Sequence, residues 1–105
     1  MKTKQKLIEL FLSQDESNLA IAWQIAVNRL NLNELAEVIG EVDKDLTRQI
    51  DAVDVFKQDA LSKYLEMQKK INSFTTFLEK EAKLVGEIFY SELISKVYEA
   101  KTNQN

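Results

Sequence analysis

The fold is decided by one uninterrupted stretch, residues 33–71, which reads NELAEVIGEVDKDLTRQIDAVDVFKQDALSKYLEMQKKI. It contains no Pro, and its only Gly is Gly40. Apolar residues recur through it in steps of three and four, which is the spacing of one face of an α-helix. These residues are Leu35, Ile39, Val42, Leu46, Ile50, Val53, Phe56, Ala60, Tyr64, Met67 and Ile71. The pattern predicts a long amphipathic helix.

An unbroken helix over this stretch would be roughly 58 Å long at 1.5 Å per residue. That length exceeds the diameter of a compact domain of this size, whose radius of gyration should be about 13 Å. Two arrangements satisfy the constraint. Either the helix is a spine with other helices laid along it, or it breaks once near Gln58 and the chain folds into a tighter bundle.

The segments before the long helix carry their own helical signals. The apolar run of residues 4–12 predicts a first helix, and residues 14–30 predict a second. Ser13 and Glu16 have the spacing of a capping box at the start of the second helix. Asn33 is expected to cap the long helix, because an Asn side chain can accept a hydrogen bond from the first turn.

The segment after the long helix predicts one more helix. Residues 72–76, Asn-Ser-Phe-Thr-Thr, indicate a turn, and Thr76 with Glu79 matches a second capping box. The last helix is expected over residues 77–100, with Gly86 tolerated inside it at a cost of about 1 kcal/mol relative to Ala. Acid-to-base pairs four residues apart support helix in the second half of the chain: Asp59–Lys63, Glu66–Lys70, Glu79–Lys83 and Glu92–Lys96.

Together these signals predict a single all-α domain over residues 1–105. No strand pattern is present in the sequence. We expect a four-helix antiparallel bundle with one long central helix, whose N-terminal half is covered by the first two helices. The last helix is expected to fold back along the other half, and residues 101–105 are expected to fray because they have nothing to bury.

One stretch carries a partial family resemblance. Residues 10–26, LFLSQDESNLAIAWQIA, resemble helical hairpins of the form L-L-x-S-x-D-E-x-N-x-x-x-A found beside leucine-rich or HEAT-like repeats in some bacterial proteins. The matching residues are Ser13, Asp15, Glu16, Asn18 and Ala22, while Gln14 stands where a Gly is common. The resemblance implies a packed helix pair of the kind used in binding scaffolds, and no catalytic residue comes with it.

Composition excludes several functional classes. The chain has 14 basic and 17 acidic residues, a net charge of −3, so it offers no basic footprint for nucleic acid or anionic lipid. It has no Cys and no His, which removes disulfides, the usual zinc sites, thiol nucleophiles and His acid–base catalysis. The apolar run of residues 7–12 is too short for a signal peptide, and no apolar stretch is long enough to span a bilayer. We expect a cytoplasmic, non-enzymatic protein without a cofactor.

The acidic part of the long helix matches a calcium-binding loop in part. Residues 43–54 place oxygen side chains at positions 1, 3, 5, 9 and 12 of a twelve-residue calcium loop. However, Arg48 occupies the position that needs Gly, Asp54 replaces the usual Glu, and the helical period continues through the segment. A solvated helix face is therefore favoured, and no metal site is expected. The alternative function is a helical ligand- or metal-binding protein using residues 41–59; a basic protein partner would also suit this charge, as in immunity proteins.

Apolar surface gives the leading functional hypothesis. Most aromatic residues lie at helical spacing and are expected in the core: Trp23, Phe56, Tyr64, Phe74, Phe77, Phe89, Tyr90 and Tyr98. The last helix, however, is apolar over a wider face than one neighbour can cover. The candidate interface with a protein partner or a second copy consists of Val55, Leu61, Phe77, Leu84, Ile88 and Tyr98. We therefore expect a protein–protein interaction module, which is an adaptor, an inhibitor or a homodimer.

A small basic group is the remaining feature. Five lysines lie near the turn predicted at residues 72–76 and could form a small basic end: Lys63, Lys69, Lys70, Lys80 and Lys83. The first two helices, read as a helix-turn-helix, carry only Arg29 as a base in the second helix. Neither feature suffices for nucleic-acid recognition, so no nucleic-acid partner is expected.

Overall fold

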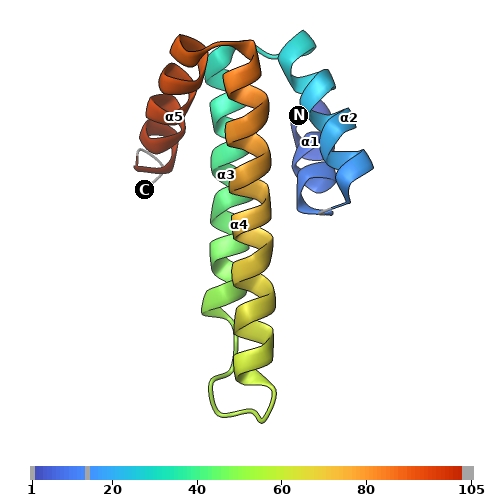
Figure 1. The fold of residues 1–105 in the computed structure, drawn as a ribbon, viewed down its shortest axis with the longest axis vertical. Coiled ribbons are helices and arrows are strands. Elements are labelled where there is room, and N and C mark those ends of the chain that lie inside the picture. The colour runs from blue at the N-terminus through green and yellow to red at the C-terminus, as the bar shows by residue number, and fades with distance from the viewer. Residues whose placement is uncertain (1, 14, 103–105) are drawn as a thin grey trace.

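The computed structural model describes residues 2–13 and 15–102, and over these residues the chain is all-α, with no strand. Five helices follow one another (Figure 1): α1 (Lys2–Leu12), α2 (Glu16–Arg29), α3 (Leu32–Asp51), α4 (Ala60–Val85) and α5 (Glu87–Thr102). Among these helices, none combines the length and the apolar composition needed to cross a bilayer.

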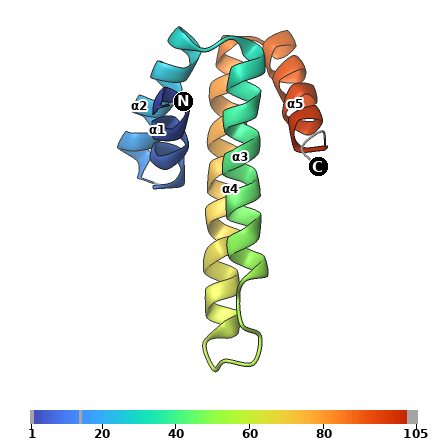
Figure 2. The ribbon, with the colours of Figure 1, turned by 180° about the vertical axis from the view of Figure 1, so that it is seen from behind.

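An antiparallel hairpin of α3 and α4 forms the axis of the molecule (Figure 1). The α1–α2 pair lies on one side of this hairpin and α5 on the other, as the view from behind also shows (Figure 2). All three flanking helices lie beside the same half of the hairpin. The other half, with the loop of residues 52–59 at its end, projects beyond them, and the molecule measures 44 × 32 × 29 Å.

The long helix is broken, so the prediction of one central helix is wrong and the alternative of a single break is the correct one. The break spans residues 52–59, and Gln58 lies within it. This segment contains β-branched Val and helix-disfavouring Asp. The Asp54 carboxylate accepts a hydrogen bond from the Phe56 backbone N–H, which favours a turn over a helix. Folding back also lets the apolar stripes of α3 and α4 cover each other, which an isolated long helix could not do.

The second half of the chain differs from the prediction in where its helices end. The turn expected at residues 72–76 does not form, and α4 continues through it to Val85. Phe74 and Leu78, one helical turn apart, are both buried, so packing outweighs the local turn signal. The real boundary is Gly86, whose N–H donates to the Ala82 carbonyl (3.2 Å) at the end of α4. The bundle therefore has five helices, and α5 folds back along α3.

The helix caps also differ from those predicted. Asn31, not Asn33, caps α3: its side chain accepts from the Glu34 N–H (2.8 Å), and its own N–H donates to the Glu34 carboxylate (3.1 Å). The capping box expected from Ser13 and Glu16 does not form. The Ser13 hydroxyl donates instead to the Leu10 carbonyl at the end of α1 (2.6 Å), and α2 begins after Asp15.

One hydrophobic core holds the five helices together, and it lies in the half of the molecule where all of them meet. The rings of Trp23 in α2 and Phe89 in α5 lie edge to face with centroids 6.5 Å apart. The predicted core position of Trp23 and Phe74 is confirmed, since both are buried. The prediction of a core position is wrong for Phe56, Tyr64 and Tyr98, which are exposed.

The end of α5 is fixed against the middle of α3. Gly40 faces this contact, and a Cβ added there would lie 3.7 Å from the Ala100 Cβ. The Lys101 ammonium group pairs with the Asp43 carboxylate. Part of the tail expected to fray is thus helical through Thr102, while residues 103–105 of that expectation lie outside the described residues.

Candidate interaction surface

The six residues of the predicted interface do not form one face. Val55 lies in the loop after α3, and Leu61 is in the first turn of α4. Leu84 and Ile88 flank the corner between α4 and α5 at the other end of the hairpin. Leu61 and Leu84 are separated by 23 residues of continuous helix, which corresponds to about 35 Å.

Five of the six residues are nevertheless exposed. Ile88 is 76% exposed, Leu84 74% and Leu61 70%, and both Val55 and Tyr98 are also open to solvent. Phe77 is the exception, since it is half-buried and packs against the core. The structure therefore divides the predicted interface into a tip group, a corner group and Tyr98 on α5.

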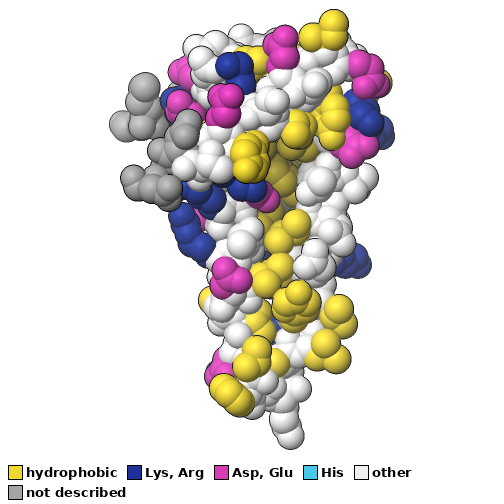
Figure 3. All heavy atoms as spheres, turned by 90° about the vertical axis from the view of Figure 1, so that its left-hand side faces the viewer, with side chains coloured by type: hydrophobic (Ala, Val, Ile, Leu, Met, Phe, Trp, Pro, Cys, Tyr) yellow, Lys and Arg dark blue, Asp and Glu magenta, His cyan; other side chains and the backbone are white. Residues whose placement is uncertain are grey.

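A group of exposed apolar residues occupies the projecting end of the hairpin, and we call it the tip cluster. It consists of Val55, Phe56, Leu61, Tyr64 and Leu65, which are all exposed. Viewed from the side of the molecule that carries α5, hydrophobic side chains gather over this projecting end (Figure 3). Sequence reasoning found only Val55 and Leu61 of the cluster. It placed Phe56 and Tyr64 in a core because it assumed that other helices would cover this part of the stretch.

Hydrogen bonds give the loop at the tip a defined shape. The Phe56 N–H donates to the Asp54 carboxylate (3.0 Å), and the Lys57 N–H donates to the Asp54 carbonyl (3.2 Å). The Ala60 N–H then donates to the Lys57 carbonyl (3.1 Å), directly before α4 begins. These turns leave the Phe56 ring 94% exposed. Such exposure of a large aromatic side chain is unfavourable in water.

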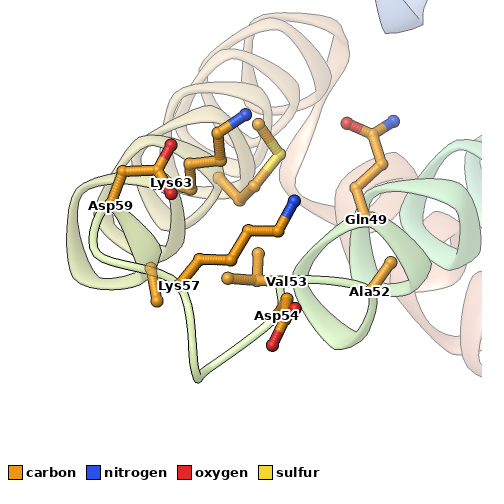
Figure 4. A pocket seen from close by; sticks show the side chains of 9 residues that line it. Gln49, Ala52, Val53, Asp54, Lys57, Asp59 and Lys63 are labelled. Atoms are coloured by element: carbon orange, nitrogen blue, oxygen red, sulfur yellow. The ribbon is translucent and has the colours of Figure 1, made fainter.

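A shallow pocket of about 420 Å³ lies on the inner side of the loop (Figure 4). The Lys57 side chain extends across it toward Gln49, and Lys63 enters from α4. Asp54 and Asp59 bring acidic groups to the same rim. The pocket therefore combines charged groups of both signs with an apolar lining of Ala52, Val53, Ala60 and Met67.

A second hollow of about 240 Å³ runs between α5 and the hairpin. Its lining is mainly apolar and includes Phe74, Leu78, Ile94 and Tyr98. The partial exposure of Tyr98 is explained by this position on the wall of the hollow. The Lys101–Asp43 ion pair also lies on its lining.

Three of the six carboxylates in residues 41–59 pair with nearby bases. Glu41 lies 3.9 Å from Lys44, Asp45 pairs with Arg48, and Asp43 pairs with Lys101. Over the part of the chain that the structure describes, no group of three or more Asp, Glu, His or Cys residues is arranged to hold a metal ion. Residues 43–51 continue α3 as an ordinary helix and form no calcium loop.

The lysines expected at a basic end are spread along α4 instead. They run from Lys63 to Lys83 without an intervening turn, a distance of about 30 Å. Lys83 is 3.1 Å from Glu79 and lies over the Tyr90 ring, 5.1 Å from its centroid. The hydrogen bond that the Lys83 ammonium group donates to Glu79 raises the pKa of Lys83 above its ordinary value. Of the four predicted acid-to-base pairs, only Glu79–Lys83 forms in the described residues.

Comparison with known proteins adds no relative to this picture. No protein-family model, no curated protein and no solved structure matches the chain.

Proposed function

We propose that this protein is a non-enzymatic protein–protein interaction module that works as an adaptor, an inhibitor or a self-associating protein. The observation that supports the proposal is the tip cluster, in which Phe56 and Leu61 are largely exposed at the end of a projecting hairpin. Soluble monomers rarely leave large contiguous apolar patches in water, and such patches mark interaction sites. Aromatic and large aliphatic side chains are also the usual anchors of protein interfaces.

The construction of the molecule suits this role. The half of the hairpin that carries the core is held by α1, α2 and α5, so the other half is presented from a fixed base. A binding surface placed on helices keeps a more precise geometry than one on long loops. We place the protein in the cytoplasm, where it acts without a cofactor, a membrane or nucleic acid.

The alternative, ligand or metal binding through residues 41–59, has less support. Three of its six carboxylates would have to leave the bases with which they pair, and α3 would have to unwind to bring several oxygens together. An ordinary helix can present only residues three or four apart on one face. The apolar tip is the stronger candidate.

Site-specific photocrosslinking in the native cells tests the interaction function. A benzoyl-phenylalanine in place of Phe56 should give adducts of discrete mass, because the partner must cover this ring. The same group in place of Gln24, an exposed residue of α2, is the matched control and should give none. Absence of adducts at both Phe56 and Leu65 would overturn the proposed function.

A further inference from the structure

We infer that the projecting end of the hairpin joins a second copy of this chain in a two-fold dimer centred on Leu65. This inference rests on the proposed function and names the partner of the same surface. Three features support it: the area of the tip cluster, the absence of charge on the adjoining face of α4, and the two-helix construction of the projecting end.

The area is close to what a stable dimer needs. With about 150–250 Å² for each fully exposed large side chain, the five residues of the tip cluster present on the order of 600 Å². A standard interface buries about 800 Å² per partner, of which the centre is apolar and the rim polar. The tip cluster thus supplies the apolar centre of one such interface, and neighbouring polar residues supply the rim.

The face of α4 that continues from the tip cluster carries no charged residue of its own, while Glu16, Lys69 and Lys80 line the hollow beside it. It is defined by helical spacing and consists of Leu61, Tyr64, Leu65, Gln68, Asn72 and Thr75, with Lys69 at its edge. The Gln68 and Asn72 amides bond to each other along this face (3.4 Å). In a two-fold interface both copies contribute the same surface patch. A patch that carries charges of one sign would therefore be repelled by the identical patch of the second copy. An uncharged face avoids this repulsion, whereas a strongly charged partner would gain nothing from it.

The projecting end also lacks the layers that a helical bundle normally has. There α3 and α4 cover only each other, because α1, α2 and α5 lie beside the opposite half (Figure 2). Two helical hairpins that pack together form a four-helix bundle, which buries a second face of each helix. A second copy would therefore complete at the tip the bundle that the flanking helices complete at the other end.

Sedimentation velocity on the full chain, from about 1 to 100 µM, tests the dimer. The wild type should sediment with twice the mass of 12.1 kDa. Leu65→Lys should sediment as a monomer with an unchanged circular dichroism spectrum, because Leu65 is 57% exposed. Ile88→Lys is the control, since Ile88 is also exposed but lies at the far end of the hairpin, and it should stay dimeric. If Leu65→Lys does not fold, Leu61→Lys takes its place.

A mixing experiment tests the symmetry. A residue at the centre of a two-fold interface lies near its own copy, so Leu65→Lys mixed with Leu65→Glu should restore the dimer that neither forms alone. A monomeric wild type at the highest concentration would overturn the dimer. A dimeric Leu65→Lys or a monomeric Ile88→Lys would overturn its location at the tip, and failure of the mixture would overturn its centring on Leu65. A monomeric wild type whose Phe56 still crosslinks to another protein would leave the proposed function intact.

Discussion

The rings of Phe11 in α1 and Phe74 in α4 meet edge to face with their centroids 5.7 Å apart, and both side chains are buried. This contact ties the first helix to the hairpin. We expect Phe74→Ala to lower the free energy of unfolding by about 3–5 kcal/mol, because it leaves a cavity and removes the ring contact. Urea denaturation measures the change. A loss below about 1 kcal/mol would show that this ring does not anchor α1.

Phe56→Ala provides the comparison for that variant. The same deletion at the tip of the hairpin removes a ring that is almost fully exposed. We expect the free energy of unfolding to change by no more than about 0.5 kcal/mol, as for ordinary surface positions. Urea denaturation should be carried out at a protein concentration where the chain is monomeric, since association would add its own stabilisation. A large loss in the monomer would mean that Phe56 packs within its own chain.

Sequence patterning was sufficient for the helices whose packing agrees with their local signals. Residues 4–12 and 14–30 were predicted as helices and are α1 and α2 with small shifts of their ends. The segment at residues 72–76 shows the opposite case. Its turn-forming residues were read correctly as a local preference, but burial of Phe74 and Leu78 in the core outweighs that preference. The stabilisation that comes from burying these two side chains depends on distant helices, so it cannot be read from the local sequence.

The interface was predicted only in part for a related reason. The apolar period in residues 33–71 is real, and it shows which face of each helix is apolar. It does not show how far neighbouring helices extend along that face. Leu35 and Leu46 are buried because other helices cover them, while Leu61 and Tyr64 in the same period lie beyond the flanking helices and are exposed. Only the three-dimensional arrangement separates core from candidate interface.

Gly40 provides a test of how closely α5 approaches α3. A Cβ at this position would be in ordinary van der Waals contact, 3.6 Å from the Lys101 side chain at its nearest. We expect Gly40→Ala to stabilise the protein by up to about 1 kcal/mol, through better helix propensity without a clash. Gly40→Leu has no room and should reduce the hydrogen-exchange protection of α5. Equal protection in the two variants would contradict the close packing of these helices.

Lys4 links α1 to α3 and should make this contact sensitive to alkaline pH. Its ammonium group donates to Glu37 (2.9 Å) and lies 3.9 Å from Glu34. The hydrogen bond with Glu37 raises the pKa of Lys4 above its ordinary value of 10.5. The stabilisation of the folded protein by the Lys4–Glu37 ion pair is therefore complete below pH 10.5. It is lost as the pH rises through the pKa of Lys4 in the folded state. The melting temperature of the wild type should exceed that of Lys4→Gln at neutral pH, and this difference should vanish above the folded-state pKa. A difference that persists there would exclude the ion pair as its cause.

Asp43 stands at the first position of the twelve residues that match a calcium loop in part. In the folded protein it lies on α3 and pairs with Lys101. Calcium coordination by residues 43–54 would require this ion pair to break and the end of α3 to unwind. We therefore expect millimolar calcium to leave the melting temperature unchanged. A ligand that binds only the folded form must raise it by mass action, so differential scanning fluorimetry with and without calcium is decisive, with magnesium as the control for ionic strength. A rise specific to calcium and absent in Asp43→Asn would contradict the expectation and restore the metal-binding alternative.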